Sequence, residues 1–189
     1  GFCDVASPTN ERTLVATLIP PACLCGDKVP TFSFESPYEW HYTVWLAVAN
    51  SFAMDFLARK KVSLKISYTL LDSLPFPRLA IDDKRVPQIV ELVLRLCCTG
   101  PEMTGYWNSA AALGWVDPIS DDHLPPCLTD ESQRLEARAE LDAIVAHDLF
   151  GLTQDEVEYI LGTFPIVERK EKERFGSFRS RGLILQYFQ

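Results

Sequence analysis

The sequence is poor in the residues and spacings that build nucleotide-binding and nucleophilic sites. It has only nine glycines among 189 residues, and none stands in the G-x-G-x-x-G or P-loop spacing that cradles phosphates. It has no G-x-S-x-G nucleophile elbow, and His147–Asp148 falls within an expected helix, where consecutive residues do not face each other. We therefore expect no complete active site and no cofactor in this chain.

Metal ligands and membrane-spanning runs are also scarce. The three histidines stand far apart and the six cysteines include no C-x-x-C pair, so local spacing does not predict a zinc site. The main apolar stretch, Tyr42 to Ala58, falls short of the roughly 20 residues that a span needs, and Asn50, Ser51 and Asp55 interrupt it. With no signal-peptide pattern at the N-terminus, we expect a cytoplasmic protein with reduced cysteines and no membrane contact.

The charge is acidic and unevenly distributed. The formal net charge is −8, so any contact with nucleic acid must come from a local patch. From Asp117 to Glu158, 12 acidic residues stand against only Arg134 and Arg138. Phosphates would repel such a segment, which favours a packed helical hairpin over a DNA-reading one. Within it, Asp121–Asp122 is typical of a solvated loop rather than of a metal site.

Local patterns predict short strands followed by helices. Thr13 to Ile19 is β-branched and stops at two prolines, and Thr31 to Glu35 alternates aromatic and hydroxyl residues, so both read as strands. Glu39 to Lys60 reads as one long buried helix, and Val62 to Leu71 as extended or looped. We therefore expect an α+β fold that is mainly α: short N-terminal strands with a long buried helix, then a C-terminal helical bundle.

The second half carries clearer helix signals. The residues after Pro87 place Ile89, Leu92, Val93 and Leu96 on one face, and Met103 to Cys127 reads as irregular. A further helix is expected over Asp130–Phe150, with Gly151 as its C-terminal cap, and another begins at the capping box of Thr153 and Glu156. Two more helices are expected over Glu168–Phe175 and from about Phe178 to Phe188. We divide the chain at these signals into residues 1–80 and 81–189.

Two basic segments remain as candidates for phosphate contact. The segment from Arg169 to Arg181 is diluted by acids at i,i+4 spacing, which favours a salt-bridged helix. The other holds Arg59, Lys60, Lys61 and Lys65, and it contains no acidic residue. It lies where a buried helix meets a loop, so phosphate contact and simple capping of the helix are both open there.

An N-terminal and a C-terminal part of the chain carry a resemblance to a known family. Thr9 to Pro21 (TNERTLVATLIPP), followed by Leu46 to Lys61 and Leu74–Pro75, resembles the late target-recognition region of type IIG DNA adenine-N6 methyltransferases, found in restriction–modification and phage defence. The stretch from Arg138 to Leu185, with its GLT turn and FPIVERK, is similar to the end of the same proteins. In one departure, Ser63 to Tyr68 stands where many relatives carry a glycine-rich turn.

The resemblance implies what this chain would do. The family methylates adenine with S-adenosylmethionine and needs an N-P-P-Y/F motif, which this sequence lacks, so the catalytic part, with or without a nuclease, would lie upstream. The chain itself would be a non-catalytic module for target recognition and scaffolding. Its partners would be double-stranded DNA and the upstream methyltransferase domain. The residues expected to contact DNA, mostly at backbone phosphates, are Asn10, Arg12, Arg59, Lys60, Lys61 and Lys65.

Two other functions stay open at this point. The chain could be a protein-interaction module whose working surface is the acidic stretch from Asp117 to Glu158. It could also be a small independent enzyme, which would require a carboxylate or thiol with a perturbed pKa in a pocket. One continuous basic face would favour DNA, whereas scattered charge with an exposed apolar patch would favour a protein partner.

Overall fold

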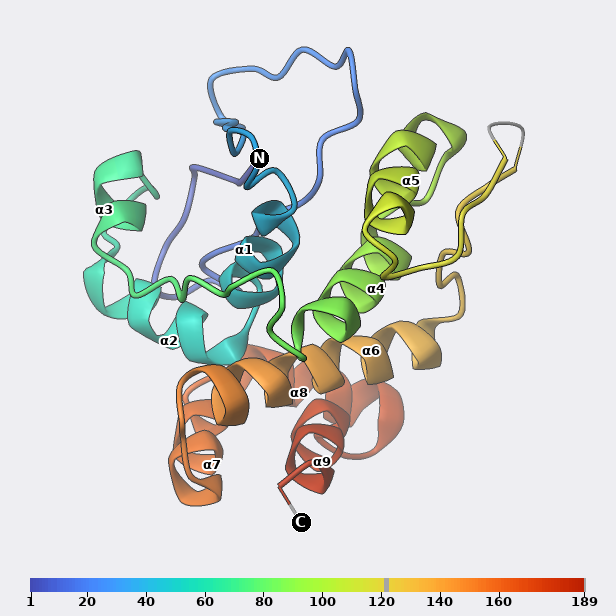
Figure 1. The fold of residues 1–189 in the computed structure, drawn as a ribbon. Helices are drawn as coiled ribbons and strands as arrows, with labels where there is room; N and C mark the ends of the chain where they lie inside the picture. The colour runs from blue at the N-terminus through green and yellow to red at the C-terminus, as the bar shows by residue number, and fades with distance from the viewer. Residues whose placement is uncertain (121–122, 189) are drawn as a thin grey trace.

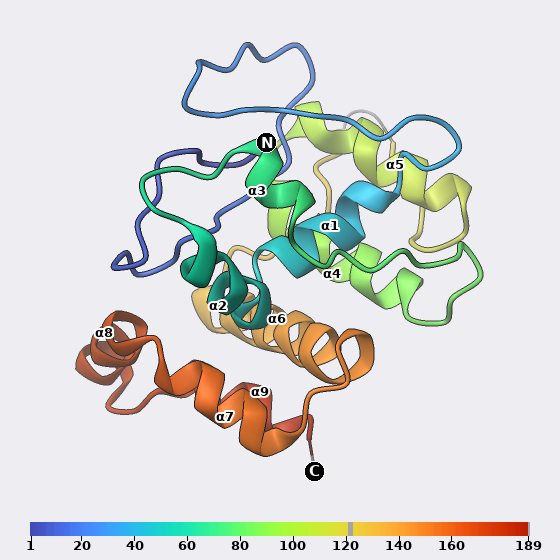
Figure 2. The same cartoon turned by 90° about the vertical axis from the view of Figure 1, so that its left-hand side faces the viewer.

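The computed structural model describes residues 1–120 and 123–188, and the regular structure within them is helical. Helices α1 and α4 cross at the centre, α6 passes below them, and α7, α8 and α9 lie beneath α6 (Figure 1). The turned view shows residues 1–40 running as loops over the upper part of the molecule (Figure 2). The helices are α1 (His41–Ala49), α2 (Phe52–Lys61), α3 (Tyr68–Asp72), α4 (Val86–Cys97), α5 (Thr104–Ala112), α6 (Glu131–Ala143), α7 (Gln154–Gly162), α8 (Pro165–Phe175) and α9 (Arg179–Gln186).

The expected N-terminal strands are wrong, and the fold is not α+β. Among the described residues, β pairing is limited to two isolated antiparallel bridges, Phe2 with Ala16 and Val5 with Lys65. In the segment Thr31–Glu35, aromatic packing takes the place of a ladder. The ring of Phe32 meets Trp45 edge-on with centroids 4.7 Å apart. Contact between aromatic rings, rather than strand pairing, therefore holds that segment against α1.

Side chains from α2 and from the turn that precedes it explain why Thr13 to Ile19 forms no ladder. Asp55 accepts the backbone N–H of Thr13 at 3.0 and 3.1 Å. The Asn50 amide pairs with both the N–H and the C=O of Ala16, each at 3.0 Å. A backbone whose polar groups are satisfied in this way does not need a neighbouring strand.

The same Asn50 lies where the expected long helix breaks. The structure replaces one helix over Glu39–Lys60 with α1 and α2. The Ser51 backbone turns into the extended region (ψ 153°), and its hydroxyl accepts the N–H of Met54 at 3.1 Å. Ser51 is therefore the N-cap of a new helix, which is a role that serine side chains favour over the helix interior.

Three further corrections concern segments without a strong periodic signal. Helix α3 overlaps the end of the stretch expected to be extended or looped, and Ser67 caps it by accepting the N–H of Leu70 at 3.1 Å. Helix α5 lies within the region expected to be irregular. Helix α8 begins at Pro165 rather than at Glu168, because proline suits the first helical turn.

The end of α6 and the start of α7 follow the local signals. Asp130 caps α6 by accepting the N–H of Gln133 at 3.0 Å, and a π-helical segment, Ile144–Leu149, continues it. Gly151 takes a left-handed conformation (φ 65°) as the chain turns. Thr153 and Glu156 form the expected capping box, which is thereby confirmed.

Two apolar clusters make the core. The larger joins residues from both sides of position 80, such as Val48 of α1 and Val90 of α4. The smaller joins Phe52 to α6, α7 and α9 through residues such as Leu161 and Ile184. Among the described residues, no helix has the length and apolar character to cross a membrane.

Candidate functional site

A buried carboxylate organises the basic end of α2. The side chain of Asp55 is fully buried, and its oxygens lie 2.6 Å from Nε of Arg12 and 3.4 Å from Nε of Arg59. The same carboxylate accepts the N–H of Thr13. Removing a carboxylate from water in this way is tolerable only because two guanidinium groups and a backbone donor satisfy it.

The two arginines use their remaining donors inside the protein. Arg12 donates from Nη2 to the carbonyl of Asn50 at 2.5 Å. Arg59 donates from Nη1 to the carbonyl of Thr163 at 3.2 Å, and from Nη2 to the carbonyls of Asn10 and Glu11 at 2.7 and 2.6 Å. Both arginines thus hold the N-terminal segment against α2, and their donors are occupied within the protein. The predicted DNA-contact residues that remain are Asn10, Lys60, Lys61 and Lys65.

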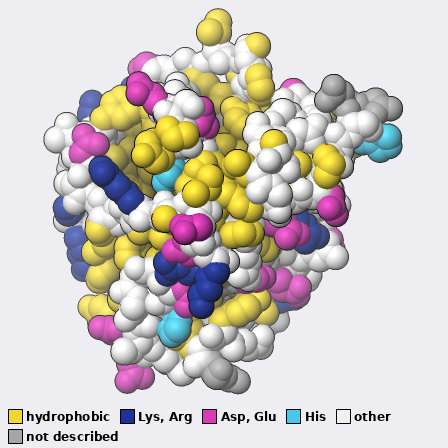
Figure 3. All heavy atoms as spheres, viewed as in Figure 1, with side chains coloured by type: hydrophobic (Ala, Val, Ile, Leu, Met, Phe, Trp, Pro, Cys, Tyr) yellow, Lys and Arg dark blue, Asp and Glu magenta, His cyan; other side chains and the backbone are white. Residues whose placement is uncertain are grey.

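Those four residues are exposed. Lys60 places its ammonium 5.0 Å from the centroid of the Phe56 ring, and Lys61 donates to the carbonyl and hydroxyl of Ser73 at 2.8 and 3.0 Å. Lys65 lies at the isolated bridge with Val5, and Asn10 lies in the N-terminal loop that Arg59 anchors. Basic side chains lie along the α2–α3 side of the molecule and again at the centre of this face, and acidic side chains lie among them as well as over α7 (Figure 3).

The C-terminal basic segment is neutralised by acids. The expected i,i+4 pairs are present, with Lys172 2.7 Å from Glu168 and Arg169 4.0 Å from Glu173. Longer-range ion pairs tie the same segment to acids elsewhere: Arg174 with Glu131, Arg179 with Glu136, Arg181 with Glu158 and Lys170 with Glu11. The salt-bridged helix is confirmed, and part of the acidic stretch from Asp117 to Glu158 is likewise paired.

The structure corrects one expectation about the acidic stretch. Nδ1 of His147 lies 2.6 Å from Oδ1 of Asp148, although consecutive residues of an α-helix do not face each other. The pair lies in the π-helical segment, where the backbone geometry differs, and both side chains are exposed. Asp121–Asp122 lies outside the described residues. Among the residues that are described, no group of three or more His, Cys, Asp or Glu side chains could hold a metal ion.

A large aromatic hollow lies between α1, α4 and α5. Its volume is about 860 Å³, and its walls include Trp40, Tyr42, Trp45 and Trp115. Hydrophobic side chains gather over this part of the surface (Figure 3). Nothing in a single sequence indicates that these side chains, from residues as far apart as Trp40 and Trp115, converge on one hollow.

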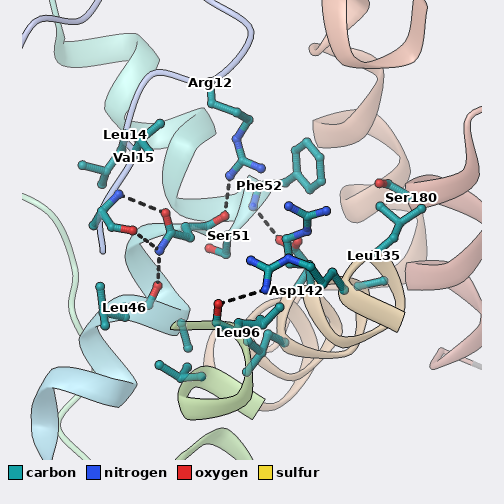
Figure 4. Close-up of a pocket in the computed structure, with 18 of the residues that line it drawn as sticks. Arg12, Leu14, Val15, Leu46, Ser51, Phe52, Leu96, Leu135, Asp142 and Ser180 are labelled. Carbon is teal, nitrogen blue, oxygen red and sulfur yellow. Dashed lines mark hydrogen bonds between the residues drawn. The ribbon is translucent and has the colours of Figure 1, made fainter. Parts of the chain in front are cut away.

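A second cavity, of about 410 Å³, lies where the N-terminal segment meets α6 and α9 (Figure 4). Arg12 and Phe52 line one side, and Asp142 and Ser180 line another. Asp142 is buried, and this burial raises its pKa to about 6, against the opposing attraction of Arg12. The sequence shows Asp142 only as one acid among 12, so its burial gave no signal there.

Comparison with known proteins adds no relative. No protein-family model, no curated protein and no solved structure matches this chain. The resemblance to DNA adenine methyltransferases therefore rests on the motifs from Thr9 to Pro75 and from Arg138 to Leu185 alone.

Proposed function

We propose that this chain is a non-catalytic C-terminal module of a DNA adenine-N6 methyltransferase that contacts the DNA backbone through the end of α2. One observation carries the DNA contact. Among the described residues, neither Lys60 nor Lys65 lies within 4.0 Å of a carboxylate, and Lys61 pairs only with Ser73. The C-terminal basic segment, by contrast, is ion-paired along its length.

Free ammonium groups suit phosphate contact. A lysine that is already paired must give up its carboxylate to bind a phosphate, whereas Lys60 and Lys65 need not. Lys60, Lys61 and Lys65 would position the duplex without reading its sequence, and Asn10 would add an amide at the edge of this patch. Methylation and S-adenosylmethionine belong, in this proposal, to an upstream domain, and the module would act beside it in the cytoplasm.

Charge reversal tests the contact. The double variant Lys60→Glu/Lys61→Glu should bind a duplex of about 30 base pairs more weakly than the wild type. The slope of its log affinity against log salt concentration should be shallower, by the amount that about two phosphate contacts contribute. The matched control is Arg169→Glu/Lys172→Glu, which makes the same change in net charge on α8. Equal affinity and salt slope in the two variants would remove the patch from the proposal.

An N-P-P-Y/F motif in the adjoining upstream sequence would support the family, and its absence would refute it.

The aromatic hollow favours a second candidate, a protein-interaction module. The exposed side chains Phe32, Ile81 and Leu113 lie in its wall, with 39%, 53% and 44% of their surface exposed. Apolar side chains that remain in water around a hollow are typical of partner sites. The change Ile81→Asp/Leu113→Asp should abolish association with a protein partner and leave duplex binding intact. The lysine variant should show the reverse.

A further inference from the structure

The cavity between the N-terminal segment and α6 has a wall rich in guanidinium groups. Arg134 and Arg138 of α6 line it together with Arg12, which lies more than 100 residues earlier in the sequence. Its volume of about 410 Å³ falls within the range of about 300 to 1,000 Å³ that is usual for small-molecule sites. The three guanidinium groups differ in how the protein balances their positive charge.

Two of the three arginines are balanced by the protein itself. Arg12 is held by Asp55 and by the carbonyl of Asn50. Arg134 donates from Nη1 to the carbonyls of Leu96 and Leu128, at 3.1 and 2.8 Å. Arg138 differs, because within residues 1–120 and 123–188 its guanidinium has neither a hydrogen-bond nor an ion-pair partner.

Among the described residues, no acid of the cavity wall forms a hydrogen bond or an ion pair with Arg138. Glu171 accepts from the N–H and the hydroxyl of Ser180 at 2.8 and 2.6 Å, and Glu11 pairs with Lys170. Asp142 accepts the N–H of Phe52 at 2.6 Å and lies more than 4.0 Å from the Arg138 nitrogens. Although Arg138 is reached by solvent, desolvation and then repulsion from Arg134 and Arg12 lower its pKa, against the weaker attraction of Asp142 and Glu131. Around Arg138, repulsion by the two arginines therefore outweighs the attraction of the two acids.

We propose that this cavity binds the phosphate group of a small molecule, with Arg138 as its main ligand. A guanidinium presents two parallel N–H donors that match the oxygens of a phosphate. Arg12 and Arg134, although already bonded, add positive potential on the same wall, which favours a dianion over a carboxylate. The apolar wall, which includes Phe52 and Leu135, would hold the body of the ligand (Figure 4). None of Lys60, Lys61 and Lys65 lines this cavity, so the site does not depend on the proposed DNA contact.

Thermal unfolding and calorimetric titration of the chain test the site, at an ionic strength held constant with sodium chloride. The probes are inorganic phosphate, adenosine 5′-monophosphate, adenosine and acetate. We expect both phosphates to bind and to raise the midpoint of unfolding, and we expect adenosine and acetate to have no such effect. A phosphate ester that binds more tightly than inorganic phosphate would show that the apolar wall takes part. If acetate binds as tightly as phosphate, the phosphate assignment is wrong.

Matched variants tie the binding to Arg138. Arg138→Gln should weaken phosphate binding about tenfold or more, and Arg138→Lys should fall between this variant and the wild type. The control is Arg169→Gln, which removes an arginine from the exposed face of α8 and should bind as the wild type does. Arg138 is exposed and unpaired within the described residues, so its loss should leave the fold intact. The midpoint of thermal unfolding of the variant without ligand checks this. Absence of phosphate binding in the wild type, or equal weakening in both glutamine variants, overturns the proposal.

Discussion

The backbone N–H of Phe52 donates a hydrogen bond of 2.6 Å to Oδ1 of Asp142, a residue 90 positions later in the chain. This bond joins the first turn of α2 to the C-terminal part of α6, inside the core. A negative charge near the start of a helix is favourable because the helix dipole is positive there. Burial opposes the charged form, and the raised pKa of Asp142 shows that burial prevails.

The titration of Asp142 should therefore appear in the pH dependence of stability. Its pKa is about 6 in the folded protein and near 3.8 when the chain is unfolded. Stability from the neutral carboxyl is fully present below the unfolded value and is lost as the pH rises through 6. The free energy of unfolding of the wild type should then fall, relative to Asp142→Asn, by about 3 kcal/mol between about pH 3.5 and pH 7. Urea unfolding at a series of pH values measures this, and a difference that does not vary with pH would contradict it.

Loss of Asp55 should be far more damaging. Asp55→Ala leaves the guanidiniums of Arg12 and Arg59 without their shared carboxylate and the N–H of Thr13 without an acceptor. The expected loss in the free energy of unfolding is about 3 to 5 kcal/mol. Glu173→Ala removes one side of an exposed pair on α8 and should cost less than about 1 kcal/mol. Equal losses in urea unfolding would show that the Asp55 network is not what stabilises this junction.

The capping box of α7 offers a local test. Thr153→Ala removes the hydroxyl that accepts the N–H of Glu156, and it should lower the free energy of unfolding by about 1 kcal/mol. Thr153→Ser keeps a hydroxyl in the same place and should lose much less. Thermal unfolding compares the two variants, and an equal loss in both would mean that the cap does not depend on the hydroxyl.

Cysteine reactivity should divide the chain into exposed and protected thiols. Burial raises the pKa of Cys98 to about 12 and also raises the pKa of Cys97. Cys3, Cys23 and Cys25 are exposed. Because the thiolate is the species that reacts, iodoacetamide at about pH 8 should modify these three and spare Cys97 and Cys98 until denaturant is added. Mass spectrometry of the native protein reads the result, and early modification of Cys98 would show that its helix opens readily.

The sequence alone determined several of the features that depend on residues within about four positions of one another, although it missed the caps at Ser51 and Ser67. The capping box at Thr153 and Glu156 and the ion pair of Glu168 with Lys172 are of this kind, because neighbouring residues supply both partners. The exposed lysines at the end of α2 could be found for the same reason, since the run Lys60–Lys61 holds no acid.

Only the tertiary structure decided the rest. Whether Thr13–Ile19 became a strand depended on Asp55 and Asn50, which reach its backbone from α2 and the turn before it. The internal use of Arg12 and Arg59 depended on contacts between α2, the turn before it and the N-terminal segment. The burial of Asp142 and the unpaired Arg138 depended on how α6 packs against a segment more than 100 residues earlier. A single sequence shows which side chains can donate or accept, but the partner of each is chosen by the packing of distant segments.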